Sequence, residues 1–184
     1  AIGAYTLVNQ NNDALNYNTA VGYSALNANT TGVQNTSVGA LSLDANTTAS
    51  NNTAVGYLSL SGNTTGGNNS AVGMNSLLAN TTGSQNTAIG RSSLASNTTA
   101  SNNTGLGYAA LNVNTTGSSN TAVGKNSLAA NTTASNNTAV GASALIANTT
   151  GTGNVAIGYL SLDANTTANY NTAVGYNTLS ANVT

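Results

Sequence analysis

Aliphatic residues recur along this chain every 17 residues, separated by runs of Asn, Thr, Ser, Ala and Gly. From Asn18 onward the unit reads N-T-A-V-G-Y-x-A-L-x-A-N-T-T-G-x-x, and it restarts every 17 residues up to Asn171 without insertion or deletion. When positions are numbered from 1 at Asn18, position 4 is aliphatic and position 9 is leucine in every copy. Such self-similarity indicates one structural unit stacked on the next. The chain therefore divides into ten repeats over residues 18–184 and a degenerate first repeat, or edge cap, over residues 1–17.

A unit of this length and composition predicts a β-solenoid. Repeats made of two helices need about 34 residues, and Asn, Thr, Val and Gly are poor helix formers. We therefore predict an all-β parallel β-solenoid, or β-roll, with one 17-residue repeat per rung. Each rung is expected to hold two short strands, T-A-V-G-Y and x-A-L-x-A, with N-T-T-G-x-x-N as a wider turn. At about 4.8 Å per rung, ten rungs extend roughly 50 Å.

The residue types at each position indicate which side chains face inward. Position 4 is mostly β-branched, as in buried strands, and position 9 is always leucine, so both are predicted to form the core. Position 5 is always glycine, which indicates a positive φ or a backbone approach too close for a Cβ. Position 6 accepts both Tyr23 and Lys125 and is expected at the surface, and the Asn residues at positions 1 and 12 are expected to form ladders between rungs. The predicted core residues are Val21, Leu26, Val38, Leu43, Val55, Leu60, Val72, Leu77, Ile89, Leu94, Leu106, Leu111, Val123, Leu128, Val140, Leu145, Ile157, Leu162, Val174 and Leu179, and the predicted structural glycines are Gly22, Gly39, Gly56, Gly73, Gly90, Gly107, Gly124, Gly141, Gly158 and Gly175.

Charge is almost absent from this chain, and that excludes several functions. Charged residues make up 3% of the sequence, with two cations and a net charge of −1, whereas soluble domains average about 25%. Two cations give no basic patch for nucleic acid. The chain has no His or Cys and only three acidic residues, so it lacks paired groups for acid–base catalysis and a ligand set for a metal. We predict no catalytic residues, no metal, no cofactor and no membrane span.

One recurring motif points to covalent modification. The sequence N-x-T, the acceptor pattern for N-linked glycans in secreted proteins, occurs at position 12 of every repeat, within the predicted wider turn. The alternative is that N-T-T serves only as a turn and ladder sequence, and both interpretations stay open at this point. The candidate glycosylation residues are Asn29, Asn46, Asn63, Asn80, Asn97, Asn114, Asn131, Asn148, Asn165 and Asn182.

The repeat also predicts self-association. Each rung offers two large apolar side chains, one aliphatic and one leucine, which is little burial for an isolated rod. No obvious polar cap of the kind that isolated solenoids need is recognisable at either end, so open rungs would pair with another chain. We therefore expect a homo-oligomer, formed side by side, by head-to-tail stacking, or both.

The repeat resembles those of bacterial and phage tail-fibre-domain proteins. The shared core is A-V-G or A-I-G followed by leucine, as in Ala20-Val21-Gly22 with Leu26. It is similar, more distantly, to the β-roll heads of trimeric autotransporter adhesins, whose S-V-A-I-G-x-x-A/S units are shorter than seventeen residues. The resemblance covers the chain from Asn18 onward and implies a surface-exposed fibre, commonly a homotrimer.

Three functions are compatible with this pattern. The first is a structural subunit or segment of an extracellular fibre or filament, with possible glycan decoration. The second is the shaft of an adhesin or receptor-binding fibre on a cell or virion surface. The third is an ice-binding solenoid, because threonine dominates positions 2, 13 and 14. The first is the prediction that we carry forward.

Overall fold

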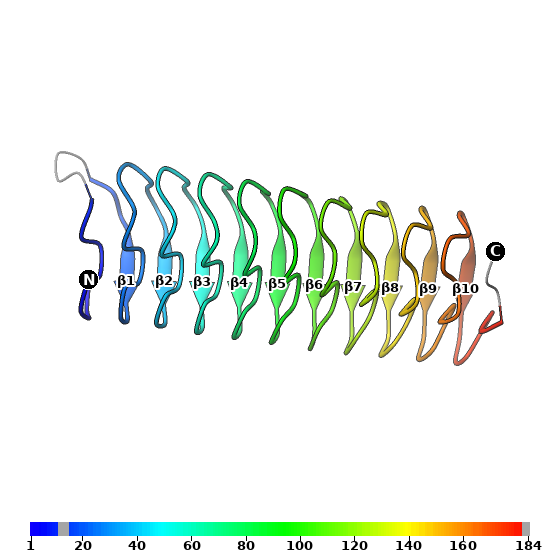
Figure 1. Ribbon diagram of the computed structural model, residues 1–184. Coiled ribbons are helices and arrows are strands. Elements are labelled where there is room, and N and C mark those ends of the chain that lie inside the picture. The colour runs from blue at the N-terminus through cyan, green and yellow to red at the C-terminus, as the bar shows by residue number, and fades with distance from the viewer. Residues whose placement is uncertain (11–14, 182–184) are drawn as a thin grey trace.

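The computed structural model describes residues 1–10 and 15–181 and shows a rod of stacked turns (Figure 1). The described residues form one sheet of three-residue strands, one strand from each repeat, which lie in chain order along the rod. The chain is thus an all-β parallel β-solenoid with a 17-residue repeat, and among the described residues no helix is long and apolar enough to cross a membrane. The strands are β1 (Thr19–Val21), β2 (Thr36–Val38), β3 (Thr53–Val55), β4 (Ser70–Val72), β5 (Thr87–Ile89), β6 (Thr104–Leu106), β7 (Thr121–Val123), β8 (Thr138–Val140), β9 (Val155–Ile157) and β10 (Thr172–Val174).

Each strand pairs in parallel with its neighbour, and each residue lies opposite its equivalent in the next repeat. Thr104 pairs with Thr121 and Leu106 with Val123, for example. The ladder continues past the strand, because the N–H of Gly107 donates to the carbonyl of Ile89 in the preceding turn at 2.8 Å. This equivalence along the rod is what makes one turn a copy of the next.

The second predicted strand, x-A-L-x-A, is not a strand, and that prediction is wrong. In the first repeat Ser24 and Leu26, at positions 7 and 9, have φ values of 51° and 54°, in the left-handed region. An extended strand cannot contain such residues. The segment is a tight turn that still bonds to its neighbour, since the N–H of Leu26 donates to the carbonyl of Ser42 at 3.0 Å.

The core differs from the predicted one, because only one of the two predicted columns is buried. Side chains alternate along a strand, so alanine at position 3 points inward and the aliphatic residue at position 4 points outward. Leu94 at position 9 is fully buried, whereas Leu106 at position 4 is 42% exposed. The interior contains the position 9 leucines, small residues at positions 3 and 8, and asparagine. The fully buried leucines are Leu26, Leu43, Leu60, Leu77, Leu94, Leu111, Leu128, Leu145 and Leu162, while Leu179 in the last turn is half exposed. The predicted core residues that lie on the outer face, intermediate or exposed, are Val21, Val38, Val55, Val72, Ile89, Leu106, Val123, Val140, Ile157 and Val174.

Glycine at position 5 is required for both of the reasons that the sequence suggests. Gly107 has a φ of +133°, which residues with a side chain rarely adopt. A Cβ at this residue would also lie 2.7 Å from the carbonyl carbon and oxygen of Gly124 in the next turn. The invariant glycine therefore permits both the corner and the close stacking of turns.

The first residues of the chain add a partial turn to the N-terminal end of the sheet. Ile2 forms a parallel bridge with Val21, and its N–H donates to the carbonyl of Ala20 at 2.9 Å. The Tyr5 ring packs edge-on against that of Tyr23, with 5.7 Å between the ring centroids. Residues 1–10 thus lie over the edge of β1.

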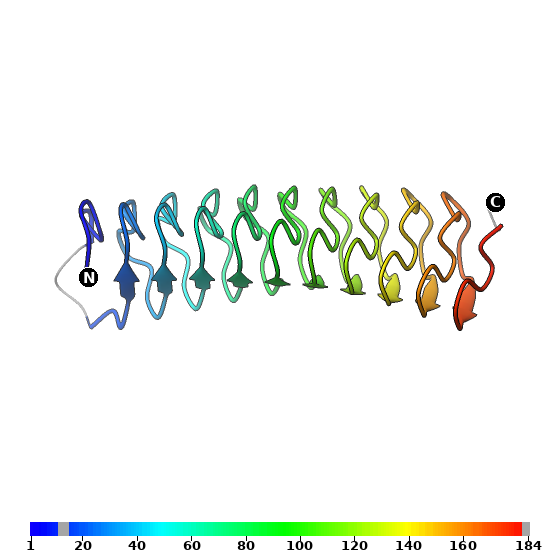
Figure 2. The same ribbon diagram turned by 90° about the horizontal axis from the view of Figure 1, so that it is seen from below.

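The rod is twisted along its length. In Figure 2, which looks from below, the strand arrows change their tilt steadily from β1 to β10. A progressive rotation of this kind is the ordinary twist of a β-sheet. Each column of equivalent residues therefore follows a shallow helical path around the rod.

Candidate functional surfaces

The asparagine side chains at position 12 form a continuous ladder inside the rod. The Asn97 Nδ2 group donates to Asn80 Oδ1 at 2.8 Å and to the carbonyl of Ala100 at 3.0 Å. Its Oδ1 atom accepts from Asn114 Nδ2 at 3.1 Å. The same link joins each described position 12 residue from Asn29 to Asn165, with distances between 2.8 and 3.1 Å. From Asn46 to Asn148, both ends of each amide hold one turn to the next.

This ladder contradicts the glycosylation prediction. An N-linked glycan needs an Asn amide nitrogen that faces solvent, but these nitrogens lie in the interior and donate two hydrogen bonds within the rod. A sugar there would replace the ladder and would have no room. Asn182 lies outside the described residues. The candidate acceptors that have no solvent exposure are Asn29, Asn46, Asn63, Asn80, Asn97, Asn114, Asn131, Asn148 and Asn165.

A second asparagine column, at position 1, donates to the same position 15 carbonyl as the position 12 asparagine of its turn. In the sixth repeat Asn103 Nδ2 donates to the carbonyl of Gly117 at 2.8 Å, and Asn114 Nδ2 donates to it at 2.9 Å. The Oδ1 atom of Asn103 accepts from the backbone N–H of Asn120 in the next turn at 2.9 Å. Asparagine at positions 1 and 12 therefore has a structural role, and the surface must carry any ligand-binding function.

One surface is the outer face of the sheet, which carries threonine at position 2 and aliphatic residues at position 4. Ile89 is 40% exposed and Leu106 is 42% exposed. Because strand neighbours are equivalent residues, these side chains form an apolar row along the rod. We call this row, positions 2 and 4 of repeats one to ten, the sheet stripe.

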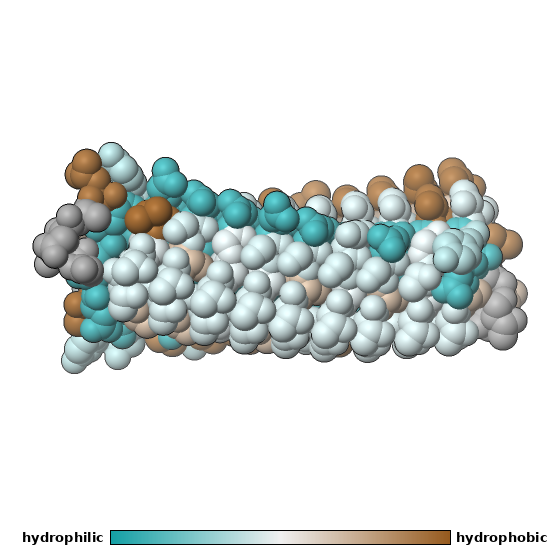
Figure 3. Space-filling model, turned by 90° about the horizontal axis from the view of Figure 1, so that it is seen from above, coloured by the Kyte–Doolittle hydropathy of each residue, from teal (hydrophilic) through white to brown (hydrophobic). Residues whose placement is uncertain are grey.

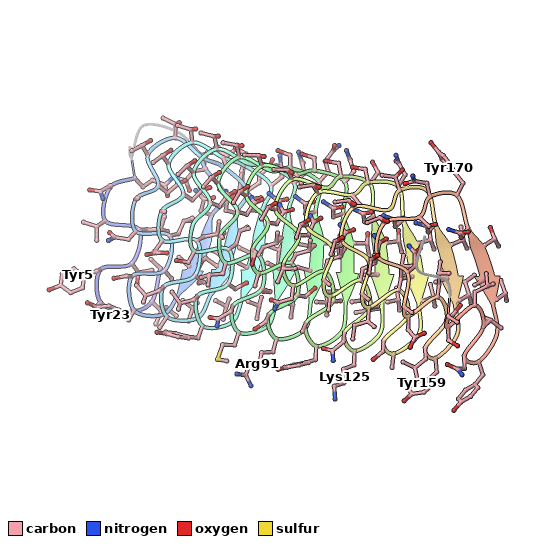
Figure 4. All side chains as sticks on the ribbon, turned by 45° about the vertical axis from the view of Figure 1, so that its right-hand side comes forward. Tyr5, Tyr23, Arg91, Lys125, Tyr159 and Tyr170 are labelled. Atoms are coloured by element: carbon pink, nitrogen blue, oxygen red, sulfur yellow. The ribbon has the colours of Figure 1, made fainter. Side chains whose placement is uncertain are left out.

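A second surface is the edge formed by position 6, which we call the position 6 stripe. In Figure 4, Tyr23, Arg91, Lys125 and Tyr159 project from one edge of the rod, and Tyr170 projects from the opposite edge. The rings of Tyr159 and Tyr176 stack at 5.5 Å with an interplanar angle of 23°. The exposed residues of this stripe are Tyr23, Tyr57, Met74, Arg91, Tyr108, Lys125, Tyr159 and Tyr176.

The third surface is the turn at positions 12 to 17, where exposed polar residues form a row along the rod (Figure 3). The position 13 hydroxyls are occupied, since Thr98 Oγ1 donates to the carbonyl of Thr115 at 3.1 Å. Position 14 instead presents an exposed threonine in every described turn, such as Thr99, and position 17 presents mostly amides, such as Asn102. This face is polar and, over the described turns, carries no charged side chain at positions 12 to 17.

The residues that the structure describes contain no catalytic or metal-binding cluster. No group of three or more His, Cys, Asp or Glu side chains lies together among them. The acids Asp44 and Asp163 both occupy position 10 but lie seven repeats apart, and Asp44 Oδ1 accepts from Ser61 Oγ at 2.7 Å. Asp13 lies outside the described residues.

Comparison with known proteins adds no identity to this geometry. No protein-family model, no curated protein and no solved structure matches the chain. Function is therefore inferred from the surfaces themselves.

Proposed function

We propose that the chain is a shaft segment of an extracellular fibre that associates with copies of itself. The observation that carries the proposal is the uninterrupted identity of the turns. Strand pairs, asparagine ladders and threonine bonds recur every 17 residues over the described rod. Such a molecule has length and stiffness as its main properties, and its extent is set by the number of repeats.

The hydrogen-bond pattern supports stiffness. Between adjacent turns the bonds run in both chain directions: Leu94 N–H donates forward to the carbonyl of Ala110 at 2.9 Å, and Gly107 N–H donates backward to that of Ile89 at 2.8 Å. The Asn97 side chain adds a further link in the interior. Bending the rod would lengthen bonds on one side in several turns at once.

The sheet stripe supports association between copies. Its aliphatic residues face solvent at one per turn, as Ile89, Leu106 and Ile157 do. Contiguous exposed apolar rows mark interaction sites, and a second copy of the chain presents a row with the same rise per turn. Copies aligned along their length can therefore match turn by turn, and the twist of each rod allows them to wrap around one another.

The shaft function is tested by changing the repeat number. Inserting two copies of repeat five, residues 86–102, should lengthen the particle by about 10 Å without changing its cross-section, at about 4.8 Å per turn. Small-angle scattering and negative-stain microscopy measure both dimensions. A particle that thickens or becomes compact on insertion would contradict the shaft proposal.

Self-association is tested separately on the sheet stripe. The triple variant Ile89→Thr, Leu106→Thr and Val123→Thr replaces three neighbouring aliphatic residues with the residue type that occupies position 2. We expect the oligomer seen by sedimentation velocity to shift to monomer. A control triple, Thr99→Ser, Thr116→Ser and Thr133→Ser on the turn face, should leave it unchanged. A wild-type monomer at all concentrations, or an oligomer that survives the stripe variant, would refute association through this face.

The ice-binding alternative is disfavoured by shape. Ice recognition by ranked threonines needs a flat face, whereas the strands of this rod rotate progressively from β1 to β10 (Figure 2). Positions 2, 13 and 14 also lie in different environments, since the position 13 hydroxyl of Thr98 bonds within the rod.

A further inference from the structure

The two cations of the chain lie together on the position 6 stripe. Arg91 belongs to the fifth repeat and Lys125 to the seventh, and Tyr108 occupies the same position in the repeat between them. All three side chains are exposed. The Arg91 guanidinium carbon lies 5.9 Å from the centroid of the Tyr108 ring. A chain with 184 residues thus concentrates both of its cationic side chains within three adjacent turns.

These cations are available for a ligand. Within the described part of the chain neither forms an ion pair, and the acids Asp44 and Asp163 lie three turns before Arg91 and two turns after Lys125. The aromatic ring orients the guanidinium by a cation–π contact, which leaves its planar N–H groups free for bidentate binding of a carboxylate or sulfate. Tyr108 is therefore a positioning residue for Arg91.

We propose that Arg91, Tyr108 and Lys125 form a binding site for an acidic polysaccharide that lies along the rod. The cations are two turns apart, about 10 Å at 4.8 Å per turn, and Tyr108 occupies the turn between them. This spacing suits an extended ligand that brings one acidic group to each cation. The site goes beyond the shaft function, because rod shape does not depend on it.

The surroundings favour a saccharide over other polyanions. Nucleic acid binding relies on many phosphate contacts and their released counterions, and two cations supply few. The flanking tyrosines of the stripe, Tyr57 and Tyr159, offer exposed rings with a polar tip, suited to ligands that are partly apolar and partly hydroxylated. An acidic peptide is typically recognised by a cluster of arginines, a groove or a free sheet edge, whereas this stripe is a convex edge of paired turns with one arginine.

The test measures binding of defined oligosaccharides to the full chain by biolayer interferometry at low salt. An oligogalacturonate presents carboxylates, a heparin oligosaccharide presents sulfates, and a maltooligosaccharide is the neutral control. We expect at least one acidic probe to bind and the neutral one not to bind. Arg91→Ala or Lys125→Ala should each weaken binding about tenfold, as loss of one charge-assisted hydrogen bond does. Tyr23→Ala, which removes a ring of the same stripe four turns away from Arg91, should change it less than about twofold.

A second set of variants moves the two cations to other turns of the same stripe. Position 6 of repeats two to four holds Ala40, Tyr57 and Met74, so Ala40→Arg with Met74→Lys recreates the cluster on other turns. In a background with Arg91→Ala and Lys125→Ala, this pair should restore binding. The proposal is overturned if no acidic saccharide binds, if polyphosphate or duplex DNA of equal charge binds more tightly, or if the moved pair fails to restore binding while circular dichroism shows an intact rod.

Discussion

The buried asparagine ladder makes a quantitative prediction at Asn97. Replacing it with alanine removes three hydrogen bonds: two that its Nδ2 group donates, to Asn80 and to the carbonyl of Ala100, and one that its Oδ1 accepts from Asn114. The carbonyl of Ala100 keeps a second donor, Asn86 Nδ2 at 2.9 Å. Asn114 Nδ2 keeps its bond to its own turn, but Asn80 Oδ1 loses its donor inside the rod.

Three lost bonds at about 1 kcal/mol each, with one buried acceptor left without a donor at about 1 kcal/mol or more, give roughly 3–5 kcal/mol. Thr99→Ala is the matched control two residues away. Thr99 is exposed, and its replacement should cost less than about 0.5 kcal/mol. The double variant with Asn80→Ala should cost less than the sum of the two single variants, because they share one hydrogen bond and the unpaired acceptor disappears.

Urea unfolding followed by circular dichroism gives the free energy of unfolding. Amide hydrogen exchange around residues 95–115 shows whether the loss is local, as stacked repeats with nearest-neighbour coupling would require. A cost for Asn97→Ala within about 1 kcal/mol of the Thr99→Ala value would refute the idea that the interior amides hold the turns together.

The same geometry makes three further predictions. Leu94→Ala, at the buried position 9, should lower the free energy of unfolding by about 2–5 kcal/mol, whereas Leu106→Ala, on the outer face, should lower it by about 1 kcal/mol. Equal losses in urea unfolding would contradict the assignment of position 4 to the outer face. Gly107→Ala should lower the free energy of unfolding by about 2–6 kcal/mol, because the added Cβ strains the backbone and collides with Gly124. Gly67→Ala, at a position where other repeats carry serine, should lower it by less than about 1 kcal/mol in the same measurement. The folded chain, treated with an oligosaccharyltransferase, should keep its unmodified mass of 18.0 kDa in mass spectrometry, and glycopeptides containing Asn97 would show that the ladder opens.

The sequence was sufficient for the fold class and for one glycine column, because both depend on period. A 17-residue unit with no tolerance for insertion leaves one rung per repeat, and a glycine that recurs at the same position of every rung indicates a corner or a close backbone approach. The turn formed by x-A-L-x-A was harder to recognise, because its sequence alternates as a strand does. Left-handed backbone at Ser24 and Leu26 carries no residue signature, since serine and leucine ordinarily avoid that region.

Position 4 was assigned to the wrong side of the rod, because hydrophobicity places valines inside in most proteins. At position 12 the expected asparagine ladder is confirmed, and the alternative of an amide that faces solvent and accepts a glycan is wrong. The signal that points the other way is the spacing N-x-x-G/A-x-x-N from position 12 to position 1 of the next repeat. In the structure the residues of this run at positions 12, 15 and 1 are buried, as Asn97, Ala100 and Asn103 are. A loop that faced solvent throughout would not need a small residue or an asparagine at every third position.

A polar interior also accounts for the repeat's constant length. An interior of leucine and alanine alone would accept several alignments of one turn on the next, because apolar contacts are not directional. An amide that must donate to the carbonyl of Ala100 in its own turn and to Asn80 in the preceding one accepts a single alignment. A turn shifted by one residue would leave buried donors and acceptors unpaired at each asparagine, at a cost of about 1–3 kcal/mol per group. The ladder therefore specifies register, and the aliphatic residues of position 4 are left available for contact with other molecules.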